Sequence, residues 1–272
     1  MSTQHRDNTN LQTKLDRVKQ RSQQDRGIVF NNLGHLIDLD MLRRCHHGLD
    51  GSKAVGIDGV YKYEYEQNLE GNLEQLLINI RKGSYHPKAS RIVEIPKSDG
   101  SKRPLAIACH EDKIVQEATK RIVEAIYEPL FIECSHGFRP ARGCDTALIA
   151  LRQHLMKWEC RAVLEIDLRK YFNTIPHEIL IKMLEKKISD QRFLRLIIKL
   201  LKAPTMKPDG TETKNEIGSP QGSLCKALHK VLWFLQFWQT YTHTMLLIHG
   251  LRMKNLKDAQ RRPLSSDTQT IW

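Results

Sequence analysis

Apolar residues return every three or four positions in several stretches of this chain, and that spacing marks one face of an amphipathic helix. The first such stretch begins at Leu11, so the polar residues 1–10 are predicted to be disordered. The same pattern predicts further helices along the chain. They cover residues 30–44, 69–81, 111–127, 145–158, 178–187 and 193–201.

Residues 91–96 alternate between apolar and polar side chains, as a half-buried strand does. The turn sequence Ser-Asp-Gly-Ser follows, and residues 103–108 return as a second strand. This pattern predicts a β-hairpin with the cations Lys97 and Arg103 near its tip. Two fixed cations could clamp a triphosphate there, although a solvated turn is the more common use of such residues.

The apolar run Ala162-Val-Leu-Glu-Ile-Asp167 predicts a strand that ends in a carboxylate and is followed by the aromatic residues Tyr171 and Phe172. A carboxylate at a strand end suits a metal ligand, but an isolated Asp there more often forms a turn or caps a helix. Residues 205–217 predict a loop or hairpin that reaches Gly218-Ser-Pro-Gln-Gly222.

The chain of 272 residues carries a net charge of +12, which indicates a polyanionic partner such as nucleic acid. Composition alone agrees equally well with a basic protein whose lysines are merely solvated. The predicted first helix displays Lys14, Arg17, Lys19 and Arg21, and a glycine-bounded loop carries Arg139 and Arg142. We expect these six cations to contact RNA phosphates, with an ordinary surface helix and loop as the alternative.

None of the six cysteines forms a Cys-x-x-Cys pair, and the first 26 residues are polar and contain no secretory signal. We therefore expect reduced, mostly buried thiols in a cytoplasmic protein. Neighbouring Cys and His residues at positions 45–47, 109–110 and 134–136 lack the spacing of a structural zinc site. The most apolar stretch, residues 231–250, contains Gln and His residues and does not predict a membrane span.

Taken in chain order, these segments resemble the reverse transcriptases of the group II intron (retron-like) family, from about Leu11 to Ser223. The resemblance depends on several short segments at family-like spacing. They are Lys53-Ala-Val-Gly-Ile-Asp-Gly59, Val93-Glu-Ile-Pro-Lys97 with Arg103-Pro-Leu, His110-Glu-Asp-Lys-Ile-Val-Gln116, Tyr127-Glu-Pro-Leu-Phe131, the Asp167 strand and Pro220-Gln221-Gly222. One departure is Asp145, where the family commonly has His after the Cys.

The resemblance implies an α+β fold, with the fingers and part of the palm of a right-hand polymerase. The implied division places a basic helical extension at residues 1–50, the fingers at 51–150, a partial palm at 151–223 and an out-of-frame tail at 224–272. The implied activity is RNA-directed DNA synthesis coupled to intron splicing and mobility.

The resemblance also implies the role of each candidate site residue. Asp167 would be catalytic and would bind Mg²⁺. The nucleotide would be held by Lys97, Arg103, Leu168, Phe172 and Gln221. The implied partners are an RNA template or the group II intron RNA, a DNA primer and a deoxynucleoside triphosphate, with no membrane.

The family's later Tyr-Ala-Asp-Asp segment, which supplies the other metal-binding carboxylates, does not occur in these residues. Shifting the codons of residues 234–242 by one base permits the family-like string Ser-Pro-Val-Leu-Ala-Asn-Ile-Tyr. We therefore expect a frameshift between about Ser223 and Val231, and a truncated chain that does not polymerise by itself. The alternatives are a non-catalytic RNA-binding remnant and a functionless product of a decayed gene.

Overall fold

The computed structural model describes residues 3–96, 100, 102–157, 174, 176–218 and 228, all within a unit bounded by Met1 and Leu232. Its α-helices are α1 (Thr3–Gln24), α2 (Leu39–Gly48), α3 (Lys62–Glu66), α4 (Leu69–Lys82), α5 (His110–Tyr127), α6 (Cys144–Lys157), α8 (His177–Glu185) and α9 (Gln191–Leu201). Two short 3₁₀ helices are η1 (Gly34–Leu36) and η2 (Glu128–Leu130), and the strands are β1 (Ser90–Pro96), β2 (Lys102–Ile107), β3 (Thr205–Met206) and β4 (Glu212–Thr213).

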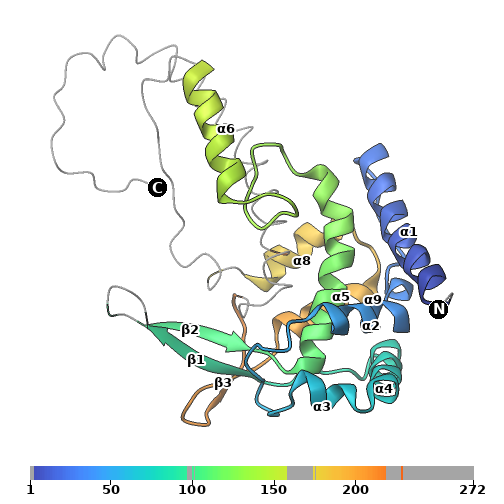
Figure 1. The fold of residues 1–272 in the computed structure, drawn as a ribbon, viewed down its shortest axis with the longest axis vertical. Coiled ribbons are helices and arrows are strands. Elements are labelled where there is room, and N and C mark those ends of the chain that lie inside the picture. The colour runs from blue at the N-terminus through green and yellow to red at the C-terminus, as the bar shows by residue number, and fades with distance from the viewer. Residues whose placement is uncertain are drawn as a thin grey trace. The chain divides into compact units, whose positions relative to one another are not determined.

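Helix α5 is the central element of the helical part, because apolar side chains on several of its faces are buried. Helices α1 and α2 both pack against it (Figure 1). At its end the hydroxyl group of Ser22 on α1 donates a hydrogen bond of 2.6 Å to the carbonyl oxygen of Ile126. The hydroxyl group of Tyr127 donates to the carbonyl oxygen of Leu184 on α8 at 3.3 Å. These contacts join three distant parts of the sequence around one helix.

The predicted β-hairpin is confirmed, with Arg91 paired to Ile107 and Pro96 paired to Lys102 in an antiparallel register. The segment at 205–217 forms a short hairpin, β3–β4, and β3 pairs in parallel with β1. The resulting mixed sheet has the order β2-β1-β3-β4. The described part of the chain is therefore α+β, as predicted.

Two helix predictions need correction. Helix α1 begins at Thr3, so the prediction of a disordered N-terminus is wrong for residues 3–10. This segment contains neither Gly nor Pro. A helix that forms from Leu11 onwards can extend towards the N-terminus, because each further residue that is fixed adds one hydrogen bond. The helix predicted at 30–44 is replaced by η1 and α2, because Asp38 caps α2 by accepting a hydrogen bond from the backbone of Met41.

The remaining predicted helices begin and end within two residues of their predicted limits. Gly83 directly follows α4, and its left-handed φ of 74° ends the helix. The strand predicted to carry Asp167 lies outside the described residues. Across the described residues, the helices are too short or too polar to cross a lipid bilayer.

Candidate nucleic-acid interface

The loop Lys53–Gly59 is held against β1 and α5 by two hydrogen bonds to its own carbonyl groups. The guanidinium group of Arg91 donates to the carbonyl oxygen of Val55 at 2.9 Å, and the ammonium group of Lys113 donates to that of Ala54 at 2.8 Å. The pKa of Lys113 is lowered, mainly because burial disfavours its charged form. These two cations therefore hold the loop in place. Their hydrogen bonds to the loop occupy part of their donor capacity.

An ion pair fixes the other end of this loop. The ammonium group of Lys88 lies 3.1 Å from a carboxylate oxygen of Asp58. Burial acts to raise the pKa of Asp58, but hydrogen bonds from Lys88 and Cys109 outweigh it, so that the pKa lies below its usual value. The Asp of the loop motif is therefore a charged structural anchor.

Gly56 allows the loop to approach α5 closely. A Cβ atom at this position would lie 2.5 Å from the Cα atom of Cys109, much closer than a carbon–carbon contact permits. The neighbouring Gly59 has a φ of 69°, a left-handed conformation that glycine adopts without strain. The two glycines of the motif therefore have different backbone roles, which sequence spacing alone does not separate.

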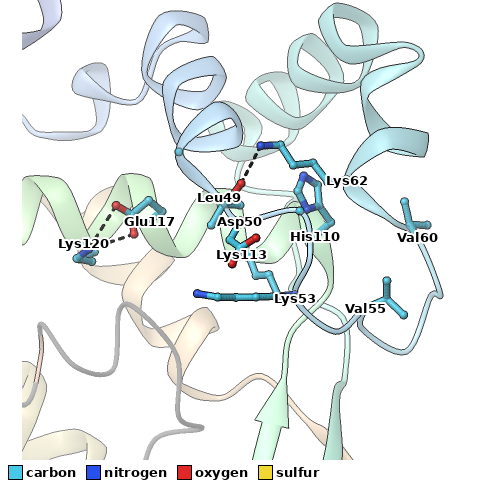
Figure 2. Close-up of a pocket in the computed structure, with 12 residues that line it drawn as sticks. Leu49, Asp50, Lys53, Val55, Val60, Lys62, His110, Lys113, Glu117 and Lys120 are labelled. Carbon is cyan, nitrogen blue, oxygen red and sulfur yellow. Dashed lines mark hydrogen bonds and ion pairs between the residues drawn. The ribbon is translucent and has the colours of Figure 1, made fainter.

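A pocket of about 310 Å³ lies between this loop, the end of α2 and one face of α5 (Figure 2). Its lining includes four lysines, which are Lys53, Lys62, Lys113 and Lys120. Lys62 donates to the carbonyl oxygen of Leu49 at 2.7 Å, and Lys120 pairs with Glu117 at 3.2 Å. Of the four, Lys53 makes no hydrogen bond or ion pair within the described part of the chain, so it is free to meet an anion.

Two exposed aromatic rings flank the pocket residue Lys62 in the sequence. Tyr61 and Tyr63 stack on each other with their ring centroids 5.5 Å apart and their planes at 25°. Their exposed fractions are 46% and 62%, so each ring still offers a face to solvent. Exposed aromatic faces next to a cation are the usual means of holding an unpaired base and its phosphate.

Lys53, Tyr61 and Tyr63 were not among the RNA contacts predicted from the sequence. From the sequence, residues 53–59 were identified only as a glycine-containing loop that resembles a segment of the family. The available signal was the alternation of Tyr and Lys at positions 61–63, one residue after a loop that ends in glycine.

Three of the four predicted cations of α1 are exposed. Arg17, Lys19 and Arg21 all lie at the surface of the helix, and the guanidinium group of Arg21 also lies 5.9 Å from the ring centroid of Phe30. By contrast, Lys14, the fourth predicted cation, pairs with Asp38 at 3.0 Å. The other three cations are therefore accessible to a phosphate backbone, and their contact with RNA stays a prediction.

The predicted cations of the loop 137–143 both make hydrogen bonds to neighbouring protein groups. Arg139 is 7% exposed at its side chain and pairs with Glu128 at 2.9 Å, while it also donates to the carbonyl oxygens of Ile132 and Ser135. Arg142 donates to the carbonyl oxygen of Glu133. Both guanidinium groups thus shape their own loop, and their predicted phosphate contacts would have to compete with these bonds.

Of the predicted nucleotide and metal residues, Arg103 lies in the described part of the chain. The backbone of Arg103 pairs with Ile95 in the hairpin, next to the ion pair of Lys102 with Glu94 at 2.8 Å. The other predicted residues lie outside the described residues. They are Lys97, Asp167, Leu168, Phe172 and Gln221.

The fit of a catalytic Mg²⁺ can be judged only from its ligands. Mg²⁺ prefers carboxylate and water oxygens. Within the described ranges, the one group that could hold a metal ion consists of two histidines and a glutamate, which is a poor match for Mg²⁺. The predicted Mg²⁺ ligand, Asp167, lies outside the described residues, so its role stays a prediction.

A known protein family matches much of this chain. The family model for reverse transcriptase (RNA-dependent DNA polymerase) matches residues 95–241, more than half of the chain. The match begins within β1 and ends inside the segment 224–272, which is predicted to be out of frame. The match does not establish a frameshift, and the frameshift therefore stays a prediction.

Several individual proteins are also similar to this chain. The group II intron-encoded protein LtrA of Lactococcus lactis subsp. cremoris is 32% identical over 79% of this chain and 36% of its own length. An uncharacterized 91 kDa protein in the cob intron of Schizosaccharomyces pombe is 34% identical over 79% of the chain and 27% of its own length. Protein YkfC of Escherichia coli is 36% identical over 72% of the chain and 52% of its own length. The chain thus spans roughly a quarter to a half of these relatives.

Proposed function

The chain belongs to the reverse transcriptase family, and we propose that it is the RNA-binding part of a group II intron-encoded reverse transcriptase/maturase. The observation that carries this proposal is the pocket beside the loop Lys53–Gly59, where Lys53 is unpaired among the described residues and two exposed tyrosine rings follow in the sequence. Residues 1–50 would extend this surface, residues 51–150 would form the fingers and residues 151–223 part of the palm.

The geometry supports contact with a single strand. Lys53 would meet a phosphate, and the exposed faces of Tyr61 and Tyr63 would stack on bases. Because stacking needs no particular base, this surface suits a template that must pass through with any sequence. The cations of α1 would add phosphate contacts that depend only on charge.

The proposed chemistry is RNA-directed DNA synthesis from a DNA primer and deoxynucleoside triphosphates. Lys97 and Arg103 would hold the triphosphate, with Leu168, Phe172 and Gln221 around the nucleotide. Asp167 would provide one Mg²⁺ ligand. Two-metal phosphoryl transfer needs further carboxylates, so we propose that these residues become active only together with a segment that supplies them.

The RNA-binding test uses a fluorescently labelled single-stranded RNA and measures anisotropy in a salt series. Tyr63→Ala should weaken binding about tenfold because a stacking ring is removed, whereas Tyr63→Phe should retain affinity. Lys53→Ala should lower the affinity and the salt slope, whereas Lys120→Ala, which removes an already paired cation, should change both less. If Tyr63→Ala and Tyr63→Phe had equal effects, and Lys53→Ala and Lys120→Ala did too, the proposal that this surface binds RNA would be refuted.

A primer-extension assay with an RNA template, a DNA primer and Mg²⁺ tests the catalytic part separately. We expect no complementary DNA from the 272-residue chain. Product that disappears in Asp167→Ala would overturn the need for further carboxylates and would leave the RNA-binding proposal intact. Negligible RNA affinity even at low salt would instead favour a product without function.

A further inference from the structure

His46 occupies an unusual position at the end of α2. The side chain is fully buried, and its Nδ1 atom lies 3.0 Å from Nε2 of His110 on α5. Since one of these two nitrogens must carry the proton, the contact fixes the orientation of the His46 ring. The other ring nitrogen, Nε2, is buried and has no hydrogen-bond partner among the described residues. A buried polar atom without a partner is costly and calls for an explanation.

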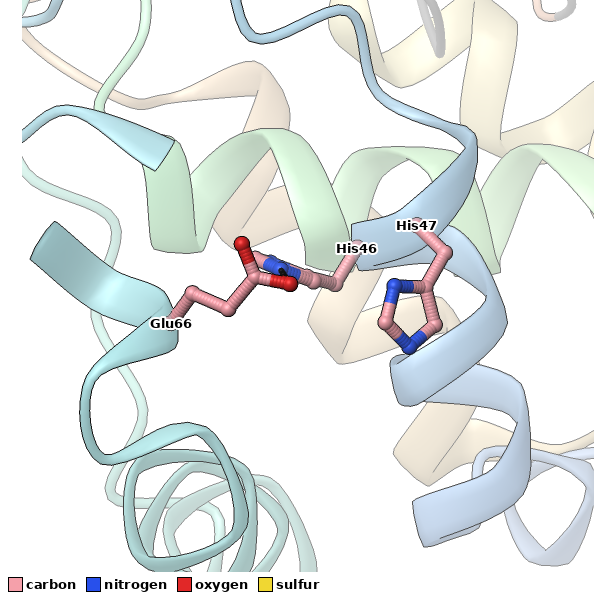
Figure 3. A group of neighbouring side chains, drawn as sticks. All are labelled: His46, His47 and Glu66. Carbon is pink, nitrogen blue, oxygen red and sulfur yellow. Dashed lines mark ion pairs between the residues drawn. The ribbon is translucent and has the colours of Figure 1, made fainter. Parts of the chain in front are cut away.

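Two further ligand groups surround this nitrogen. His47 follows on the same helix turn, and Glu66 reaches across from the end of α3 (Figure 3). Nε2 of His46 lies 3.9 Å from a carboxylate oxygen of Glu66, too far for a hydrogen bond. One potential ligand atom from each of the three side chains lies within 4.8 Å of the other two.

We propose that His46, His47 and Glu66 bind a divalent transition-metal ion of the Zn²⁺ class, with a water molecule in the fourth position. Two imidazole nitrogens and one carboxylate oxygen form a ligand set that Zn²⁺ accepts. Zn²⁺ bonds of about 2.0 Å in a tetrahedron need ligand atoms roughly 3.3 Å apart. His47 and Glu66 are exposed and can close this difference by side-chain rotation, while His46 stays fixed.

The contact with His110 fits this role. If the Nδ1–H group of His46 donates to His110, the lone pair of Nε2 is left for a metal ion. A hydrogen bond on the second ring nitrogen is the usual arrangement behind a metal-bound histidine. Tyr65 stacks on His46 with ring centroids 5.9 Å apart and further restrains the ring.

One positive charge opposes the ion. Lys62 acts electrostatically on His46, but its ammonium group is bonded to the carbonyl oxygens of His47 and Leu49. The ion would join the end of α2 to the end of α3, next to the pocket that Lys62 and His110 line. The three proposed ligands are different residues from the proposed Mg²⁺ ligand Asp167, and the proposal does not depend on the proposed function.

The test uses the full chain without an affinity tag and Co²⁺ as a spectroscopic probe for Zn²⁺. We expect one equivalent of Co²⁺ to give visible absorption bands of a tetrahedral nitrogen–oxygen site, without the near-ultraviolet band of a thiolate ligand. Addition of Zn²⁺ should displace the Co²⁺ signal and raise the thermal unfolding midpoint, since the ion binds the folded state.

Matched variants locate the site. His47→Ala and Glu66→Gln change exposed side chains, should leave the circular dichroism spectrum unchanged, and should each weaken Co²⁺ binding at least tenfold. His35→Ala, at a histidine elsewhere in the chain, and Cys134→Ser with Cys144→Ser should retain binding. Absence of binding, a thiolate band, or unchanged affinity in His47→Ala or Glu66→Gln would overturn the proposal.

Discussion

Asp190 accepts a hydrogen bond of 2.7 Å from the backbone N–H group of Leu33, a residue 157 positions earlier in the chain. The same carboxylate oxygen also accepts from Gly34 at 2.9 Å. The other oxygen accepts from Arg192 and Phe193 and caps α9. One side chain thus caps α9 and ties it to the 3₁₀ helix η1, so the N-terminal segment and α9 hold each other in place.

Asp190→Ala should lower the free energy of unfolding by about 2–4 kcal/mol, because a helix cap is removed and buried N–H groups lose their acceptor. Urea unfolding followed by circular dichroism measures this decrease. Asp209→Ala is the control, since Asp209 is exposed and accepts from a neighbouring turn residue, Thr211. Equal decreases in both variants would contradict the double role of Asp190.

The same carboxylate predicts a decrease of stability in acid. Burial acts to raise the pKa of Asp190, but its backbone hydrogen bonds outweigh it and hold the pKa below the usual value. Its stabilising contribution is therefore complete above about pH 4, the pKa of Asp in an unfolded chain, and is lost as the pH falls further. The stability difference between the wild-type chain and Asp190→Ala should shrink over this range.

Gly56→Ala should destabilise the chain by about 1–3 kcal/mol, because the added Cβ atom would overlap the backbone of Cys109 and force the loop Lys53–Gly59 away from α5. Gly137→Ala is the matched control, since a Cβ atom at that position meets no atom within 4 Å. Thermal unfolding of both variants measures the difference. A stable Gly56→Ala chain with unchanged RNA affinity would show that the close approach is not needed.

Asp112 should give a pH dependence of the opposite sign to that of Asp190. Burial raises its pKa to about 6, even though it accepts hydrogen bonds from Tyr85 at 2.6 Å and from the backbone of Lys88. Between about pH 4 and 6 the folded chain retains a proton that the unfolded chain has lost, so stability falls as the pH rises.

The comparison with Asp112→Asn isolates this effect, because Asn does not titrate. Relative to this variant, the free energy of unfolding of the wild-type chain should fall by about 1.4 kcal/mol for each unit of pKa elevation. The variant is needed because His110, whose pKa burial lowers to about 4, contributes in the opposite direction over the same range. A constant difference from pH 4 to pH 7 would contradict an elevated pKa.

Replacing Arg17, Lys19 and Arg21 by Ala should lower the affinity for RNA and flatten its salt dependence, by about 0.7–0.9 in slope for each phosphate that is no longer neutralised. The control replaces three cations that are already paired with carboxylates and so removes the same net charge. They are Lys14, Lys102 and Lys120. Fluorescence anisotropy over a salt series measures both quantities, and identical behaviour of the two triple variants would show that only total charge matters.

Periodicity in the sequence was sufficient to predict α4, α5, α9 and the hairpin β1–β2. These elements have a strong apolar repeat or a clear alternation, and most of them end at a Gly, a Pro or a turn sequence. Prediction failed at residues 3–10 and 30–44. In the first case a helix continued into a polar segment, and in the second a capping Asp38 started a new helix inside an apolar repeat.

The candidate site was less predictable than the fold. Arg139 was predicted to contact a phosphate and Arg91 to begin a strand, yet the guanidinium groups of both are bonded to protein groups. Among the pocket lysines, Lys53 alone is unpaired within the described residues, although no sequence pattern distinguishes it from Lys62 or Lys113. Charge and composition indicate a nucleic-acid partner, but they do not tell which cations remain available to it.

By itself, the sequence determined the family, the basic character and the order of the helices and strands, because these depend on residue types and short spacings. The tertiary structure alone decided which side chains are used internally. Arg91 donates a hydrogen bond to a carbonyl group 36 positions away. Asp190 accepts hydrogen bonds at the start of η1, 157 positions away, and at the start of α9, which directly follows it. Hydrogen-bond partners at such separations are set by packing, and a local sequence pattern contains no information about them.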